Sequence, residues 1–297
     1  MSTLLVGNYG SGNLGDELIL AAALREYPTA VVMTRDPEFS QQFCEQSFRT
    51  IPWPPAGLRS LLHYALSSEY RAALTRYPIT EVVFAGGGLW AGSTGSMTSA
   101  YRVWTAVLWW LRRLFPTATV RLTHMGFDPP VTHLQRQMLT YVCSSVSTLT
   151  VRDPHSLAAI APFFPQARLA GDRLEATPFP PVAPPSTTTA VVLINALSPV
   201  SQPTIAAVQA TRPTATLLGI LMDPRDTRPP GISTITPRTR SELQALYSGA
   251  VAVYAERLHA LHCGVKWCPG TTTVLRKPYS SKVQALQEHY HLPSWSS

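Results

Sequence analysis

The sequence predicts an α/β fold made of two Rossmann-like domains, each a parallel sheet flanked by helices. Its 297 residues suffice for two domains at roughly 150 residues each. Short β-rich segments alternate with helical patterns along the chain, which is typical of parallel strands joined by crossover helices. Five prolines between 177 and 189 interrupt this alternation, and proline continues neither a helix nor a central strand. We therefore expect an N-terminal domain at 1–178, a linker at 179–189 and a C-terminal domain at 190–297.

In the N-terminal domain, each expected strand is a short run of mostly apolar and β-branched residues that follows a turn, and each expected helix carries apolar residues at helical spacing. The first helix opens with two acidic residues, and the last opens with Pro154, a residue favoured in the first helical turn. Strands are expected at 3–6, 30–34, 81–85, 119–123 and 148–151. Helices are expected at 16–27, 58–76, 98–115, 132–143 and 154–161.

The C-terminal domain repeats this pattern after the prolines. The segment 223–231 is rich in turn residues and separates two of its strands. Strands are expected at 190–195, 215–221, 232–236, 250–254 and 265–268. Helices are expected at 204–211, 241–248 and 256–263, with a last helix from Ser281. In a sheet of this kind ligands bind at the carboxyl ends of the strands, and we expect the ligand site between the two domains.

Composition and charge narrow the function further. The net charge is +7, and residues 181–297 hold 10 Lys/Arg against 5 Asp/Glu, which makes the C-terminal half the better anion binder. Nucleic acid is not the expected partner, because no dense basic stripe interleaved with exposed aromatics is present. The longest apolar stretch, 103–111, is too short for a membrane span, and no secretory leader is evident. Four unclustered cysteines suit a reducing compartment, so we expect a cytoplasmic protein.

The first loop contains Gly10-x-Gly12-x-x-Gly15, and Asp36 follows about twenty residues later, which satisfies the dinucleotide-binding pattern. However, Asp16 and Glu17 stand at the helix start, where a pyrophosphate would bind and where two carboxylates would repel it. Two interpretations stay open. Either the glycines form a tight turn and the acids cap the helix, or the loop meets a neutral polar ligand with a carboxylate available as a base.

Two further segments place polar or flexible residues after buried strands. Gly86, Gly87 and Gly88 follow the strand at 81–85, and glycine lets the backbone approach a ligand or a neighbouring loop. Arg152 ends the strand at 148–151 and should project at the carboxyl edge of the sheet. The alternative is that Arg152 forms an ion pair with Asp153 or Asp172.

The start of the helix at 256–263 resembles an anion site. Arg257 and His259 lie in its first turn, where cations are unfavourable unless an anion binds there too. His259 and His262 are three residues apart, but no third ligand is evident, and we expect no metal.

The aromatic segment 101–115 carries Trp104, Trp109 and Trp110, followed by two arginines. Such a basic amphipathic helix could rest on a membrane surface, or its apolar face could pack in the core. The favoured interpretation is a core helix, and peripheral contact with the inner face of the membrane is the second one.

Taken together, these motifs resemble the polysaccharide pyruvyl transferase family, in order and nearly end to end. The resemblance is carried by six segments: Gly12-Asn13-Leu14-Gly15-Asp16-Glu17; Gly86-Gly87-Gly88; His124-Met125-Gly126-Phe127-Asp128-Pro129; Val151-Arg152-Asp153 with Ser156; Ser241-Glu242-Leu243 before Arg257-Leu258-His259; and Tyr279 with Lys282. It implies a GT-B-like fold, phosphoenolpyruvate as co-substrate without a further cofactor, and as acceptor a sugar of a cell-surface polysaccharide or of its precursor, including a lipid-linked one.

The resemblance, together with the acid and base that ketal formation requires, implies roles for individual residues. His259, Arg152 and Asp16 are the expected catalytic residues, with His259 as the acid and Asp16 or Glu17 as the base. The substrate-binding residues expected are Arg257, Lys282, Gly12, Asn13, Glu17, Gly87, Gly88 and Tyr279. Three other functions stay open: a GT-B glycosyltransferase that uses a nucleotide sugar, a dinucleotide-dependent oxidoreductase, and a binding protein of this family that has lost catalysis.

Overall fold

The computed structural model describes residues 2–53, 67–90, 97–178, 190–275 and 281–295. The chain divides into two compact units. The first holds residues 1–11 and 16–177, and the second holds residues 178–297 together with Gly12–Gly15. The expected boundary at 178 lies beside this division, whereas the proposed linker at 179–189 lies outside the described residues.

The first unit is built on an eight-stranded parallel sheet with the order β3-β2-β1-β4-β6-β7-β8, and β5 also pairs with β6. The strands are β1 (Ser2–Val6), β2 (Val31–Thr34), β3 (Arg49–Pro52), β4 (Ile79–Phe84), β5 (Gly87–Trp90), β6 (Thr119–Phe127), β7 (Thr148–Val151) and β8 (Arg168–Leu169). The helices are α1 (Leu14–Glu26), α2 (Pro37–Cys44), α4 (Ser68–Thr75), α5 (Met97–Leu114), α6 (His133–Ser144), α7 (Pro154–Ile160) and α8 (Arg173–Ala176).

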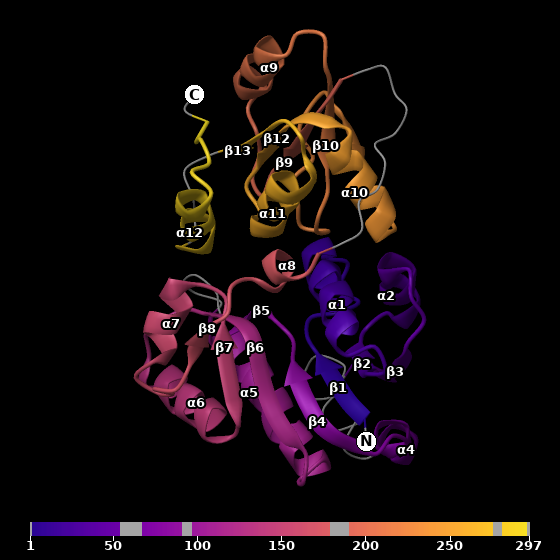
Figure 1. The fold of residues 1–297 in the computed structure, drawn as a ribbon, viewed down its shortest axis with the longest axis vertical. Helices are drawn as coiled ribbons and strands as arrows, with labels where there is room; N and C mark the ends of the chain where they lie inside the picture. Colours follow the sequence, from indigo (N-terminus) through magenta and orange to yellow (C-terminus); the bar gives the residue numbers. More distant parts are fainter. Residues whose placement is uncertain (1, 54–66, 91–96, 179–189, 276–280, 296–297) are drawn as a thin grey trace. The chain divides into compact units, whose positions relative to one another are not determined.

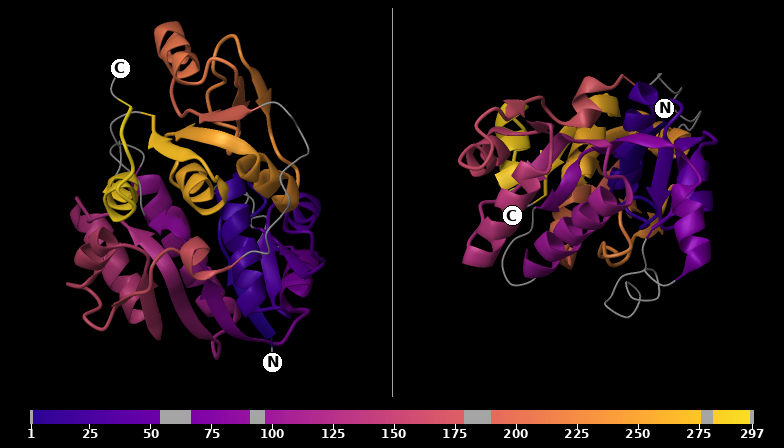
Figure 2. Two further views of the ribbon diagram at one scale, coloured as in Figure 1. Left: turned by 45° about the horizontal axis from the view of Figure 1, so that its top comes forward. Right: turned by 90° about the horizontal axis from the view of Figure 1, so that it is seen from below.

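The strand order places helices on both faces of this sheet (Figures 1 and 2). From β1 the chain runs outward to β2 and β3, and from β4 it runs in the opposite direction to β6, β7 and β8. Because crossovers between parallel strands are right-handed, the two directions put their helices on opposite faces. α5 and α6 therefore share one face, where they pack side by side (Figure 1).

The second unit has a five-stranded parallel sheet with the order β11-β10-β9-β12-β13. Its core holds aliphatic side chains of β9 and β12 together with Tyr254, on which Trp295 packs edge-on at 5.4 Å. The strands are β9 (Val191–Asn195), β10 (Thr216–Ile220), β11 (Ser233–Ile235), β12 (Ala250–Ala255) and β13 (Thr271–Val274). The helices are α9 (Gln202–Thr211), α10 (Arg240–Ser248), α11 (Leu258–Trp267) and α12 (Ser281–His289).

Most expected elements are found within a few residues, but the strand expected at 265–268 is wrong. Those residues complete α11 as far as Trp267, and the strand beside β12 is β13, at Thr271–Val274. Gly264 does not end the helix, since its backbone packs closely against Thr272 of β13. Of the helix expected at 58–76, the described part is α4, and residues 58–66 lie outside the described ranges.

β4 and β5 behave as one strand interrupted by a glycine break. β4 pairs with the first half of β6, and β5 pairs with its second half. Between them Gly86 and Gly87 have φ angles of +105° and +90°, which residues with a side chain rarely adopt. The glycine run predicted at this strand end therefore meets a specific backbone requirement.

α5 packs its aromatic face into the core of the first unit, as the favoured interpretation predicts. Tyr101, Trp104, Leu108 and Leu111 are buried, and the Trp104 ring packs on Trp53 at 5.0 Å. Within the described ranges, no helix combines the length and apolar character that crossing a bilayer requires.

Candidate functional site

The loop after β1 is shaped by glycine conformations and by Glu17. Gly10 and Gly12 have φ angles of +70° and +81°. A β-carbon at Gly10 would overlap the backbone of Asp36, so only glycine fits there. The Gly10 N–H donates to Glu17 Oε1 at 2.6 Å. The side chain of Asn13 accepts from the Gly15 N–H at 3.0 Å, beside the start of α1.

Asp16 and Glu17 have different surroundings. Glu17 is fully buried, and burial raises its pKa to about 8. The expected contact of Glu17 with a substrate stays a prediction; in this structure its side chain has no exposed surface and holds the loop through the Gly10 N–H. Asp16 is 9% exposed and accepts from Asn8 Nδ2 at 2.9 Å. Asp16 is thus the more exposed carboxylate of this pair.

Asp16 also lies beside the glycine break at the end of β4. A β-carbon on Gly87 would stand 3.6 Å from Asp16 Oδ1, and one on Gly86 would stand 3.1 Å from Ile19 of α1. The break therefore lets the start of α1 approach the carboxyl end of the strand. Of the three glycines, Gly88 is half-buried and Gly87 is buried.

Arg152 lies at the end of β7 between two carboxylates. Its Nε is 3.4 Å from Asp153 Oδ2, and its Nη1 is 3.7 Å from Asp172 Oδ2. Both acids also cap helices: Asp153 accepts from the Ser156 N–H at the start of α7, and Asp172 accepts from the Leu174 N–H at the start of α8. The alternative expectation of an ion pair is therefore confirmed for both acids.

Gly126 makes room for the Arg152 guanidinium. A β-carbon at Gly126 would stand 2.8 Å from Nη2 and 2.9 Å from Nε of that side chain. The side chain of Arg152 is only 5% exposed, so the group is held in place with little freedom. Arg152 thus presents a fixed, largely neutralised cation at the carboxyl edge of the sheet.

The dinucleotide pattern has a local explanation. Asp36 accepts from the Phe39 N–H at 3.0 Å and caps α2 with Pro37 in the first turn. This carboxylate therefore has a structural task as a helix cap.

In the second unit, Gly12–Gly15 lie against residues that follow β10 and begin α11. The Leu14 N–H donates to the Met222 carbonyl at 2.7 Å. A β-carbon at Gly15 would overlap the His259 ring, and one at Gly12 would stand 2.9 Å from Pro224. The unit thus brings together Gly12, Asn13 and His259, three of the expected site residues.

Arg257 stands at the end of β12, where two carboxylates hold its guanidinium. Its Nε donates to Asp226 Oδ1, and its Nη2 is 3.5 Å from Asp223 Oδ1. Burial alone would raise the pKa of Asp223, but the hydrogen bonds from Arg225 and the charge of Arg257 outweigh burial and hold that pKa below its ordinary value. The guanidinium is therefore strongly oriented, and its charge is offset.

Asn195 and Asp226 complete this arrangement, and sequence analysis missed both. The fully buried Asn195 ends β9, donates through Nδ2 to Asp226 Oδ2 at 2.8 Å and accepts from the Arg257 N–H at 3.3 Å. Asp226 Oδ2 also accepts from the Met222 N–H at 2.8 Å. A polar side chain ending the apolar run Val-Val-Leu-Ile was the available signal for Asn195.

The start of α11 has no side-chain cap and no acidic residue in its first turn. The positive end of the helix dipole favours an anion at such a position. His259 is half-buried there, and its ring centroid lies 6.5 Å from that of the buried His262. Lys282 is half-buried on α12, which packs against α11, whereas Tyr279 lies outside the described residues. Among the described residues, no group of three His, Cys, Asp or Glu side chains could hold a metal.

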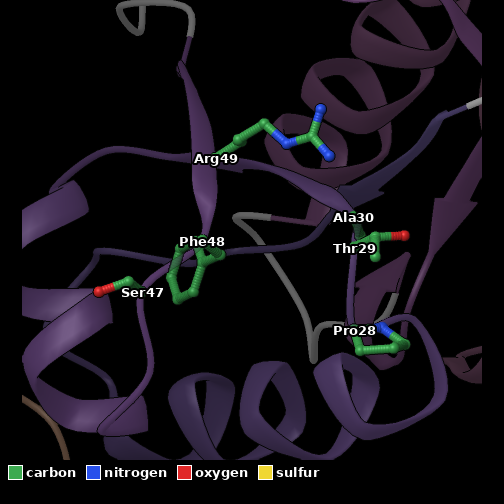
Figure 3. Close-up of a pocket in the computed structure, with 6 residues that line it drawn as sticks. All are labelled: Pro28, Thr29, Ala30, Ser47, Phe48 and Arg49. Atoms are coloured by element: carbon green, nitrogen blue, oxygen red, sulfur yellow. The ribbon is translucent and has the colours of Figure 1, made fainter.

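A pocket of about 380 Å³ lies away from these residues, at the amino ends of β2 and β3 (Figure 3). Its lining residues are Pro28, Thr29, Ala30, Ser47, Phe48 and Arg49. Ligands of parallel α/β sheets bind at the opposite, carboxyl edge, and none of the expected site residues lines this pocket.

No family model matches the sequence, and no curated protein matches it. Solved structures match its fold. A putative UDP-N-acetylglucosamine 2-epimerase from Listeria monocytogenes has a TM-score of 0.57 at 10% identity, over 98% of this chain and 83% of its own. The UDP-GlcNAc 2-epimerase from Neisseria meningitidis bound to UDP-GlcNAc has a TM-score of 0.54 at 13% identity, and the match covers 96% of this chain and 85% of the epimerase chain. The glycotransferase of kitacinnamycin has a TM-score of 0.51 at 12% identity, and the match covers 99% of this chain and 86% of the glycotransferase chain. At these identities the likeness concerns the fold, and it confirms that the chain has the expected GT-B-like α/β fold.

Proposed function

We propose that this protein is a transferase that moves a pyruvyl group from phosphoenolpyruvate to two hydroxyls of a saccharide. The support from sequence is the order of the six motifs. The support from structure is that Gly86, Arg152 and Arg257 each follow the carboxyl end of a strand, where ligands of this fold class bind.

The observation that carries the proposal is the end of β12 with the start of α11. Arg257 is oriented there by Asp223 and Asp226, His259 follows two residues later, and the first turn of the helix has no cap and no acid. Because the two carboxylates offset the charge of Arg257, the helix N–H groups and the ammonium of Lys282 would contribute to binding the phosphate and carboxylate of the donor.

The chemistry assigns one task to His259. A proton from an imidazolium adds to the methylene carbon of phosphoenolpyruvate, which becomes a methyl group and leaves a cation-like centre at the neighbouring carbon. A sugar hydroxyl attacks that carbon and loses its proton. Phosphate then departs, the second hydroxyl forms the other C–O bond of the ketal, and its proton is also lost. Imidazole suits the first step because it titrates near neutral pH.

The base belongs to the first unit in this proposal. Asp16 is the better candidate of the acidic pair, because Glu17 is fully buried and binds the Gly10 N–H. Gly87 and Gly88 would leave room for a sugar near Asp16. Arg152 would contribute a fixed charge at the same edge of the sheet.

The test incubates the purified protein with phosphoenolpyruvate and a panel of saccharide acceptors, including lipid-linked ones, and measures inorganic phosphate. We expect phosphate release that depends on an acceptor, and a decrease of about 10²–10³-fold or more in the His259→Gln variant. The control is His133→Gln, an exposed histidine on α6 that should leave turnover unchanged. Full activity of His259→Gln would remove His259 from the mechanism, and no release with any acceptor would contradict pyruvyl transfer.

The structural likeness favours a second candidate, a glycosyltransferase or related enzyme that acts on a nucleotide sugar. The Neisseria meningitidis structure contains UDP-GlcNAc, and the phosphates of such a donor would suit the same helix start. Thermal unfolding in the presence of phosphoenolpyruvate, UDP-sugars or NAD(P)H distinguishes the candidates, since a ligand at 100 times its Kd stabilises by about 2.7 kcal/mol. Stabilisation by UDP-sugars alone would favour this second candidate, and stabilisation by NAD(P)H would favour the oxidoreductase.

A further inference from the structure

The outer face of α5 combines exposed apolar side chains with arginines. Its exposed residues are Arg102, Val103, Ala106, Trp109 and Arg113, and these define what we call the α5 face. The spacing of these residues puts them on one side of the helix. Val103 is 46% exposed and Trp109 is 47% exposed, although the opposite side of the same helix already fills the core.

The charged residues of α5 have one sign. The helix carries Arg102, Arg112 and Arg113 and no acidic residue, and Asp128 is the acidic residue of the segment that leads into α6. Asp128 is close to His155, at 3.7 Å between Oδ1 and Nε2. The Arg113 guanidinium lies over the Trp109 ring, 4.7 Å from its centroid. A basic group and an indole are thus held together at the surface of the helix.

α6 extends this surface. α5 and α6 both join parallel strands on one face of the sheet, so they run in the same direction, and they pack against each other. The Tyr101 hydroxyl at the start of α5 donates to the Asp128 carbonyl at 2.7 Å, which fixes the segment leading into α6. Val131 is 70% exposed and Leu134 is 39% exposed at that end. Arg136 is an exposed cation on the same helix.

We propose that the α5 face, together with Val131 and Leu134, docks on the surface of a membrane that contains anionic phospholipids. Exposed aliphatic side chains and an indole enter the region between headgroups and acyl chains, and arginines bind the phosphates above them. A protein partner would need an acidic surface that fits this face closely. An anionic lipid surface needs no such fit, because its phosphates can bind the arginines while the separate apolar side chains insert between the lipids. The inference is independent of the reaction that the protein catalyses.

The test measures co-sedimentation of the full-length protein with vesicles of phosphatidylcholine and phosphatidylglycerol, and with vesicles of phosphatidylcholine alone. We expect binding to the mixed vesicles that falls in about 1 M salt, and weak binding to the neutral ones. The double variant Arg102→Glu/Arg113→Glu should lower the partition coefficient by at least about tenfold. Trp109→Gln, which leaves the charge unchanged, should lower it as well.

The matched control is Arg168→Glu/Arg212→Glu, which changes the net charge by the same amount at exposed positions on other elements. We expect this variant to bind nearly as well as the wild-type protein. An equal loss in both double variants would show that general charge attraction is responsible and would overturn the inference. Absence of binding by the wild-type protein would overturn the inference as well. It would also be overturned if light scattering showed a wild-type dimer that Trp109→Gln separates into monomers, because a second copy of the chain would then occupy the α5 face. Circular dichroism of each variant verifies its fold.

Discussion

At the residue scale, adjacent side chains of the same chemistry have different tasks. Asp16 and Glu17 are neighbours on α1, yet Glu17 is fully buried and fixes the loop through the Gly10 N–H, whereas Asp16 keeps some exposure beside Gly87. The sequence could not separate them, because both belong to the same motif. The difference comes from the helix rotation that turns Glu17 toward the loop and away from solvent.

Glu17 should make stability depend on pH. Its pKa is raised to about 8 by burial, above the value in the unfolded chain. Between the two values the unfolded state has fewer bound protons, so the free energy of unfolding falls as pH rises through that window. Replacing Glu17 with Gln should flatten this dependence, and chemical denaturation at several pH values measures it. The exposed Glu38→Gln variant should keep the wild-type slope. Equal slopes in wild type and Glu17→Gln would contradict the assignment.

Asp226 should contribute more to the stability of the protein than the exposed Arg225, its neighbour in the sequence. Its carboxylate is fully buried, pairs with Arg257 and accepts from Asn195 and Met222. Replacing Asp226 with Ala leaves these donors without an acceptor, and we expect a loss of about 3 kcal/mol or more in urea unfolding. Arg225→Ala is the matched comparison: its side chain is 77% exposed, so it should cost at most about 1 kcal/mol. Similar losses in the two variants would refute the role given to Asp226.

At the element scale, most of the elements that the sequence predicted are present, because apolar periodicity is a local signal, but α2, β3, β5, β8 and α8 were not predicted. The prediction failed where a contact between distant segments decides the structure. Gly264 looked like the end of a helix, but it lets α11 pack closely against β13 and continue to Trp267. For the same reason Asp223 and Asp226 were read as turn residues, although they hold Arg257, more than thirty residues later in the chain.

Gly264→Ala should therefore destabilise the protein, against the usual helix preference. Alanine in place of glycine normally stabilises a helix by about 1 kcal/mol. Here the added β-carbon would stand 2.7 Å from Oγ1 and 2.9 Å from Cγ2 of Thr272, a buried side chain. Thermal unfolding should show a lower Tm for Gly264→Ala, partly restored by Thr272→Ala in the double variant. A raised Tm of the single variant would mean that the close packing is not limiting.

At the scale of the whole molecule, the chain forms two units with separate sheets and separate cores. The GT-B-like fold could be predicted from the strand–helix alternation together with the motif resemblance, because both depend on local sequence. The assignment of Gly12–Gly15 to the second unit could not be predicted, since these residues lie at the end of the loop after β1 and in the first turn of α1, both of which belong to the N-terminal part of the sequence.

Because the two units have separate cores, a destabilising substitution in one unit should increase local unfolding in that unit and leave the other unit unchanged. In the Asp226→Ala variant, hydrogen exchange monitored by mass spectrometry should become faster in β9, β10 and β12 of the second unit. Exchange in β1, β4 and β6 should stay near its wild-type level, because those strands belong to the first unit's sheet. Uniformly faster exchange in both sheets would show that the chain unfolds as one cooperative body.

Asp153 makes two interactions, a helix cap and an ion pair, and this affects how a mutational scan of the protein is interpreted. One oxygen of this carboxylate starts α7, and the other faces Arg152. An alanine at this position removes both interactions at once, so a loss of function in such a scan would not reveal which one mattered. Serine is the informative replacement, because a hydroxyl can begin a helix but cannot balance a guanidinium.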